Sequence, residues 1–193
     1  MGCDKSGLVI DGQPLWQRQL ATLRALEPAE LFISGRADGP YVGADVPIVF
    51  DAEPGFGPIG GLVAALRHTQ QPYLLVLAVD LPAMTPGFLR SLLAIASSQG
   101  LGVAPYFDGR FEPLAAVYPQ ECAPLAEEFL HTGADRSLQG FIREAVARRI
   151  MTSYLPEETG RRLFLNLNMP LDFGPLIELS GAQSIRYPHP HGP

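Results

Sequence analysis

A seven-residue apolar run, YLLVLAV at 73–79, ends abruptly at Asp80. A strand with one face in water alternates apolar and polar residues, whereas a parallel strand covered by helices on both faces is apolar throughout. The run is also far shorter than the roughly 20 residues of a membrane-spanning helix. It therefore predicts the central strand of a sheet that is buried between two layers of helices.

Strands and helices alternate on both sides of this run. Helices are predicted over 14–26, 61–69, 86–99, 122–131 and 136–149, and shorter strands over 8–10, 30–34, 47–50 and 163–167. Asp108-Gly109 is a strong hairpin signal, so an antiparallel excursion is expected late in the sheet. This order of elements predicts an α/β fold, a three-layer sandwich around a mostly parallel sheet.

Charge and cysteine content exclude several classes of protein. The chain has 14 basic and 20 acidic residues, a net charge of −6, and no basic block that could neutralise the phosphates of a duplex. Cys3 and Cys122 do not form a disulfide framework. We therefore expect a reducing, cytoplasmic location, with no nucleic acid and no membrane as partner.

Polar residues follow the predicted strands at their carboxyl ends. In open α/β sheets ligands bind in the crevice outside these ends, which directs attention to Ser34, Asp51, Asp80 and Asn168. Glycines at 55, 57, 60 and 61 follow Asp51 and would let a backbone approach a ligand closely. We expect one ligand site at this edge.

Each candidate also has a plain structural interpretation. Asp80 can hold Mg²⁺, which binds one or two carboxylates together with substrate phosphates, or it can cap a strand-to-helix turn. Asp51 can contact a ligand or simply close a turn. Lys5 can reach phosphates as a point charge or lie in solvent. The four histidines lack metal-ligand spacing, and no nucleophile motif is present.

Taken in order, these segments resemble the molybdenum cofactor guanylyltransferases, within the nucleotidyltransferases that have a Rossmann-like sheet. The matching stretches are MGCDKSGLVIDGQPLWQRQL at 1–20, ISGR at 33–36, VFDAEPGFGPIGGL at 49–62, LVLAVDLPAMTP at 75–86, EPLAAVYP at 112–119 and FLNLNMPLDF at 164–173. The resemblance covers nearly all of residues 1–176. It implies transfer of GMP from GTP to the terminal phosphate of molybdopterin bearing molybdenum, with release of pyrophosphate.

The resemblance also implies roles for single residues. Lys5 matches the lysine that ends the family's signature loop and would contact the GTP phosphates. Ser34 and Asp51 fall in segments on the guanine or ribose side. Asp80 matches the magnesium ligand, which makes Mg²⁺ the expected cofactor, and Asn168 lies in a late N-x-N motif on the acceptor side.

The sequence departs from the family at its start. The family opens with an apolar strand and a loop of the form L-A-G-G-x-S-x-R-M-G-x-D-K, of which only the last five positions match, at Met1 to Lys5. A central strand and most of a phosphate loop are thus expected to be missing. Either the true start lies upstream, which the intact downstream motifs favour, or the chain is a truncated copy.

Three functional hypotheses follow. The first is the guanylyltransferase, the second is an inactive protein that binds nucleotide or molybdopterin, and the third is a related cytidylyltransferase. In all three, residues 1–179 would form the nucleotidyltransferase domain and residues 180–193 a loose tail.

Overall fold

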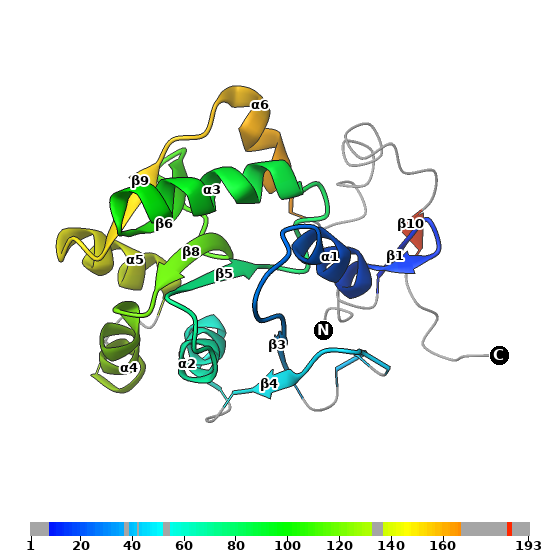
Figure 1. The fold of residues 1–193 in the computed structure, drawn as a ribbon, viewed down its shortest axis with the longest axis horizontal. Helices are drawn as coiled ribbons and strands as arrows, with labels where there is room; N and C mark the ends of the chain where they lie inside the picture. Colours follow the sequence, from blue (N-terminus) through cyan, green and yellow to red (C-terminus); the bar gives the residue numbers. More distant parts are fainter. Residues whose placement is uncertain are drawn as a thin grey trace.

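The computed structural model describes residues 8–36, 39–41, 43–51, 55–132, 137–166 and 185–186. Its helices are α1 (Leu15–Arg24), α2 (Pro58–His68), α3 (Pro86–Gln99), α4 (Cys122–Thr132), α5 (Leu138–Ala147) and α6 (Glu158–Arg161). Its strands are β1 (Val9–Ile10), β2 (Gln13–Pro14), β3 (Ile33–Gly35), β4 (Ile48–Phe50), β5 (Tyr73–Leu77), β6 (Gly102–Phe107), β7 (Arg110–Phe111), β8 (Ala115–Pro119), β9 (Met151–Tyr154) and β10 (Ile185–Arg186). Figure 1 shows their arrangement.

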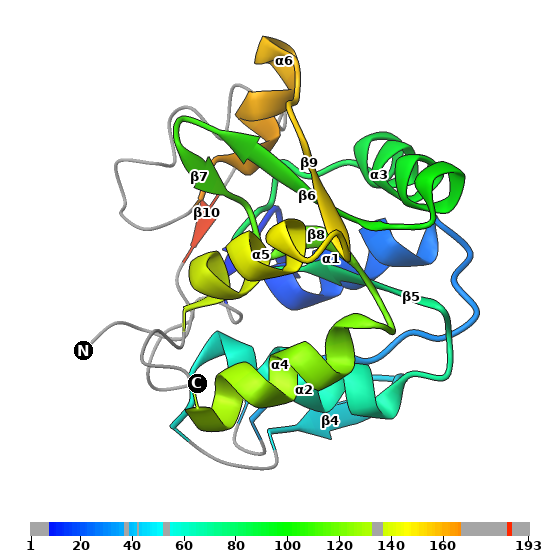
Figure 2. The same ribbon diagram turned by 90° about the vertical axis from the view of Figure 1, so that its left-hand side faces the viewer.

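The largest sheet has the strand order β5-β8-β6-β7, and β9 pairs with the other edge of β6. Helix α3 lies on one face, and α2 and α4 lie on the opposite face (Figures 1 and 2). Side chains alternate accordingly. Leu74 and Tyr118 pack with α2, α4 and α5, whereas Val103 and Val117 pack with α3. The predicted α/β class is thus confirmed. The YLLVLAV strand lies between helices as expected, but within β5 only Leu74 is buried and the other residues are half-buried.

Strand direction differs in part from the prediction of a mostly parallel sheet. Among the described residues, parallel pairing is confined to β3–β4 and β6–β9, while β8 runs antiparallel to both β5 and β6. The hairpin at Asp108-Gly109 is confirmed, because β6 and β7 flank it. A connection of this length reverses the chain, so β7, the strand directly after it, must run antiparallel to β6.

The predicted strand at 163–167 is wrong over its described residues. Residues Arg162–Phe164 form a short 3-10 helix, in which Phe164 packs edge-on against Phe88 at a ring-centroid distance of 5.4 Å. The strand of this region is instead β9, whose sequence MTSY carries too little apolar content to stand out. Pairing with β6 stabilises β9 as a strand although its own residues have only a weak preference for strand structure.

Two smaller sheets lie outside the main one. Strand β1 pairs with β2 and β10, so Ile185 and Arg186, within the range predicted as a loose tail, contact the start of the described chain. Strands β3 and β4 form the other small sheet, which lies below α1 in Figure 1. None of the helices in the described ranges is both long and apolar enough to cross a bilayer.

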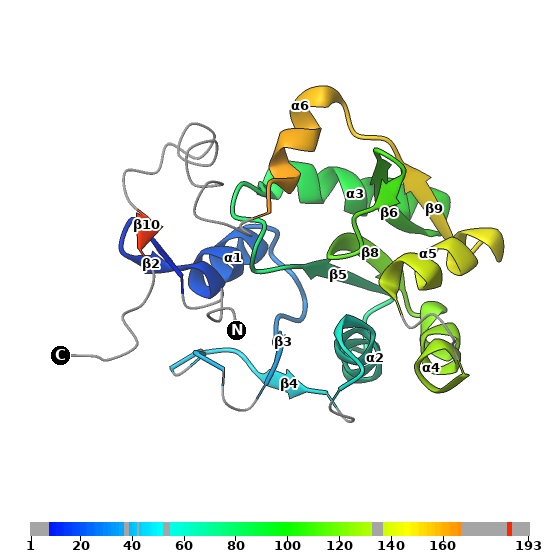
Figure 3. The ribbon, with the colours of Figure 1, turned by 180° about the vertical axis from the view of Figure 1, so that it is seen from behind.

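Among the described residues no strand joins the β3–β4 sheet to β5. A cavity of about 670 Å³ lies between them instead, and it is lined by β3, by β5 and by side chains of α1 and α2. Figure 3 shows β3 and β5 on either side of this region, seen from behind.

Candidate functional site

The carboxyl ends of β3 and β4 meet the first turn of α2. The two strands pair in parallel, with Ser34 opposite Val49 and Gly35 opposite Phe50. The side-chain oxygen atoms of Ser34 and Asp51 therefore both lie beside Gly61 of α2. A Cβ atom at Gly61 would lie 3.0 Å from Ser34 Oγ and 3.4 Å from Asp51 Oδ1. Gly61 thus allows a close approach, because a side chain there would press on the Ser34 hydroxyl.

Helix α2 begins beside these oxygens in a way that suits an anionic ligand. Gly57 precedes the helix with a φ of 65°, and Pro58 occupies its first turn, where a missing N–H costs nothing. The first N–H groups of a helix lack a partner in a preceding turn, which makes such an end a ready site for phosphate. In α2 the Gly60 N–H already donates to the Gly57 carbonyl oxygen at 3.0 Å. Burial raises the pKa of the nearby Asp51 carboxyl.

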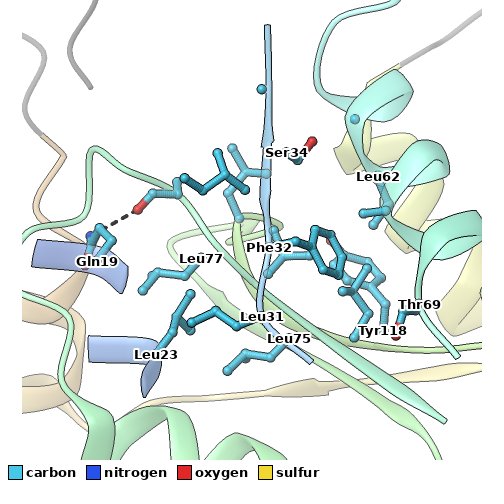
Figure 4. Close-up of a pocket in the computed structure, with 18 of the residues that line it drawn as sticks. Gln19, Leu23, Leu31, Phe32, Ser34, Leu62, Thr69, Leu75, Leu77 and Tyr118 are labelled. Carbon is cyan, nitrogen blue, oxygen red and sulfur yellow. Dashed lines mark hydrogen bonds between the residues drawn. The ribbon is translucent and has the colours of Figure 1, made fainter. Parts of the chain in front are cut away.

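Asp80 lies in the turn after β5, next to the same cavity. Val79, directly before it, lines the cavity together with Ser34 and Asp51. The turn is held by Gln19 of α1, whose Nε2 donates to the carbonyl oxygens of Ala78 at 3.1 Å and Leu81 at 2.8 Å. This bridge, drawn for Ala78 in Figure 4, fixes where the Asp80 backbone emerges from the sheet.

A second carboxylate lies near Asp80. Burial raises the pKa of Glu112, the positive charge of Arg110 opposes that rise, and the negative charge of Asp80 adds to it. Two carboxylates that repel each other at the rim of a sheet form a donor set that a hard divalent cation would stabilise. No group of three or more histidine, cysteine or acidic side chains with metal-binding geometry occurs in the described ranges.

Glu112 also lines a second cavity of about 460 Å³. Its basic lining residues are Arg161 and Arg162. The Nη1 atom of Arg161 lies 3.4 Å from Asp108 Oδ1, and its guanidinium carbon is 5.8 Å from the centre of the Phe107 ring. The Nε atom of Arg161 is buried and has no hydrogen-bond partner among the described residues. Three carboxylates and two guanidinium groups thus line this cavity.

The structure thus brings together most of the residues that the sequence singles out. Ser34 and Asp51 converge on α2, and Asp80 lies at the same edge of the fold. Lys5 and Asn168 lie outside the described residues. Sequence reasoning missed Glu112 and Arg161. The first lies in the quoted EPLAAVYP segment, but nothing in that segment shows that the hairpin folds back toward Asp80.

Comparison with known proteins shows the family to which the chain belongs. A sequence profile described as "MobA-like NTP transferase domain" matches residues 1–149. The chain belongs to the MobA-like NTP transferase family. Among curated members, the probable molybdenum cofactor guanylyltransferase of Opitutus terrae is 36% identical, over 89% of this chain and 86% of that protein. The molybdenum cofactor guanylyltransferase of Rhizobium meliloti is 31% identical, over 88% and 81%.

Solved structures of the MobA-like family and beyond it share the fold. Molybdopterin-guanine dinucleotide biosynthesis protein A from Archaeoglobus fulgidus has a TM-score of 0.74 and 25% identity, covering 93% of this chain and 92% of that one. A 2-C-methyl-D-erythritol 4-phosphate cytidylyltransferase from Thermus thermophilus has a TM-score of 0.70 at 18% identity, over 92% and 94%. The nucleotidyltransferase fold is therefore confirmed, and it is common to proteins named for different bases.

Proposed function

We propose that this chain transfers GMP from GTP to a molybdopterin-type molybdenum cofactor, giving the guanine dinucleotide form and pyrophosphate. The observation that carries the proposal is the convergence of Ser34 and Asp51 on the first turn of α2, beside the Asp80 turn. The names of the curated relatives supply the reaction class and its two substrates. We assign the reaction to the cytoplasm, where thiols such as that of Cys122 stay reduced.

We assign the nucleoside of GTP to the α2 end of the site. A carboxylate accepts hydrogen bonds from the N–H groups of guanine or from ribose hydroxyls, and Asp51 offers one next to the Ser34 hydroxyl. The N–H groups at the start of α2 then face the phosphates. Lys5, outside the described residues, would add a positive charge at the leaving pyrophosphate.

The chemistry needs positioning more than a protein nucleophile. A phosphate oxygen of the acceptor attacks the α-phosphorus of GTP in line with the leaving pyrophosphate, so the protein aligns two anions and stabilises developing charge. Mg²⁺, when bound, would supply Lewis-acid stabilisation of the phosphate oxygens. Asp80 would hold it, with Glu112 close enough to add negative charge. Gln19 holds the Asp80 turn in place.

We assign the acceptor to the second cavity, together with Asn168. Arg161 and Arg162 offer guanidinium groups to a phosphorylated molecule. An acceptor phosphate in this cavity would lie beside Glu112, whose carboxyl senses the charge of Asp80.

The test compares Asp80→Asn with Asp45→Asn. Asp45 is exposed and pairs with Arg24 on the surface, so it serves as a matched control. Calorimetry should detect GTP binding that is tighter than CTP binding, and pyrophosphate release should depend on both Mg²⁺ and acceptor. Asp80→Asn should lower that release by at least about a hundredfold with unchanged circular dichroism, while Asp45→Asn should not.

Three results would contradict the proposal. Full activity of Asp80→Asn would remove the metal role. Preference for CTP would reassign the base, in line with the cytidylyl relatives of the fold. Tight GTP binding without any pyrophosphate release would favour a binding protein rather than an enzyme.

A further inference from the structure

Asp80 and Glu112 lie at the same end of the β5–β8 strand pair. A backbone hydrogen bond joins the two segments here, from the Ala78 N–H to the Leu114 carbonyl oxygen at 2.7 Å. Asp80 follows Ala78 by two residues, and Glu112 precedes Leu114 by two. The charge of Asp80 consequently acts on the Glu112 carboxyl. Neighbouring carboxylates repel each other, so a site that uses both for one cation has to hold each of them in place.

The segment that carries Asp80 is held by a buried glutamine of α1. Gln19 Nε2 donates to the carbonyl oxygens of Ala78 and Leu81, on either side of Asp80. Support for Glu112 has to come from another part of the fold, because Glu112 directly follows the β6–β7 hairpin.

Phe111, the residue before Glu112, has backbone groups that the sheet does not use. It lies opposite Tyr106 in the hairpin, and the next N–H, that of Glu112, donates to the Pro105 carbonyl at 2.9 Å. Antiparallel residues alternate between pairs that exchange hydrogen bonds and pairs that do not. The N–H and C=O groups of Phe111 therefore point away from β6. In the described part of the chain β7 is an edge strand, so no strand receives them.

Gln139 of α5 takes the place of a neighbouring strand at this position. Its Nε2 donates to the Phe111 carbonyl at 2.7 Å, and its Oε1 accepts from the Phe111 N–H at 3.1 Å. Gln139 lies in the first turn of α5, where Ser137 caps the helix by accepting from the Gly140 N–H at 3.1 Å. Phe141 of the same turn is fully buried. The backbone next to Glu112 is thus fixed to a helix that is anchored in the core.

We propose that Gln139 is a positioning residue of the Mg²⁺ site: by fixing Phe111 it holds the Glu112 carboxylate beside Asp80, so that both carboxylates act on one cation. The cation is that of the proposed function, on which this inference rests. Gln139 acts through the backbone of Phe111 and needs no contact with the metal. Groups that orient metal ligands in this way typically change metal affinity by about 10–100-fold when they are removed.

The first test removes the amide of Gln139 and measures cation binding. Gln139→Leu keeps an apolar side chain of similar size and loses both hydrogen bonds. Mn²⁺, which favours the same carboxylate ligands as Mg²⁺, is titrated into the 193-residue protein, and the free ion is measured by electron paramagnetic resonance. The dissociation constant should rise by about tenfold or more, and hydrogen exchange of the Phe111 amide should become faster.

Gln120→Leu is the matched control. Gln120 also donates to a backbone carbonyl, that of Leu66 at 3.0 Å, but it directly follows Pro119, at the opposite end of β8 from Glu112. Its loss should leave the Mn²⁺ dissociation constant within about twofold. Equal weakening by the two variants would show a general loosening of the fold and would overturn the proposal.

A double variant decides whether Gln139 acts through Glu112. Glu112→Gln removes the carboxylate and should itself weaken Mn²⁺ binding. Added to this variant, Gln139→Leu should cause less than about twofold further loss, because the group that it positions is already gone. A further loss of about tenfold in this background would overturn the proposal.

Kinetics supply a readout that a purely structural role would not move. In GMP transfer, Gln139→Leu should raise the Mg²⁺ concentration that gives half the maximal rate by about tenfold, and saturating Mg²⁺ should restore the rate to within about twofold. Loss of rate at every Mg²⁺ concentration would assign Gln139 to folding alone. Unchanged Mn²⁺ binding by Gln139→Leu would overturn this inference and leave the proposed function standing, whereas an unsubstituted protein that binds no Mn²⁺ would overturn the metal role of Asp80 as well.

Discussion

The hydroxyl oxygen of Ser34 lies 3.0 Å from the position that a Cβ atom would take at Gly61. This is closer than side chains ordinarily approach, so a side chain at residue 61 would force the Ser34 hydroxyl to shift by a few tenths of an ångström. The close approach has a functional consequence. It leaves the Ser34 hydroxyl and the Asp51 carboxyl facing the start of a helix, where the proposed nucleotide site needs them.

Gly61→Ala should therefore weaken both the fold and the site. Alanine is the better helix former by about 1 kcal/mol, but its methyl group overlaps the Ser34 hydroxyl, and overpacking costs about 1–3 kcal/mol. We expect a net loss in the free energy of unfolding, measured in urea, and GTP binding that is weaker by about tenfold, or 1.4 kcal/mol.

Gly87→Ala is the matched control for this change. Gly87 also lies in a helix, α3, but a Cβ atom there would meet only Thr85 Oγ1 at 4.0 Å. It should gain up to about 1 kcal/mol from helix propensity without affecting GTP. If both variants gained stability alike, Gly61 would be an ordinary helix residue.

Asp51→Asn should stabilise the protein at neutral pH while weakening GTP binding. Burial raises the pKa of Asp51 in the folded state. Protonation of Asp51 therefore stabilises the folded protein fully at pH values below the unfolded-state pKa of about 3.9. This stabilisation is lost as the pH rises through the higher pKa of the folded state. The asparagine side chain does not ionise, so the variant does not lose this stability. The melting temperature of Asp51→Asn should therefore exceed that of the unchanged protein by a margin that grows from pH 4 to pH 7. Parallel pH profiles for the two proteins would contradict the assignment.

Cys122 should be almost inert toward alkylation in the folded protein. Its side chain is fully buried, and burial raises the pKa of the thiol to about 12. Because the thiolate is the reactive form, alkylation at pH 8 should be slower than for a free cysteine by on the order of a thousandfold. The experiment uses Cys3→Ser, which leaves one thiol, with and without 8 M urea. Fast labelling without urea would show that α4 opens readily.

Tyr118→Phe should destabilise the strand that supports Glu112. The buried Tyr118 hydroxyl donates to the Pro113 carbonyl at 2.7 Å. Removing it leaves a carbonyl short of a partner, at a cost of about 1–3 kcal/mol in urea unfolding. Tyr106→Phe is the control, because Tyr106 is 38% exposed and its change should stay within about 0.5 kcal/mol. Equal changes in the free energy of unfolding for the two variants would show that the hydrogen bond from Tyr118 to Pro113 does not contribute to stability.

Local signals were strong enough to predict most of the helices closely. Pro86 and Gly100 bracket α3, and both boundaries are where the sequence places them. Asp108 adopts the positive φ that the hairpin turn needs. Strand β9 was missed because its side chains are half polar and its stability comes from pairing with β6, which no local pattern records.

The sequence by itself determined the α/β class, the apolar central strand and the polar residues that end the strands, because each depends on spacing along the chain. Only the tertiary structure decided which of these residues meet. It joined Ser34 to Asp51 through the parallel pairing of β3 and β4, and it brought Glu112 within range of the Asp80 charge by folding a hairpin back. Contacts between residues far apart in sequence depend on how strands pair and how helices cover them, so they appear only when the chain is folded.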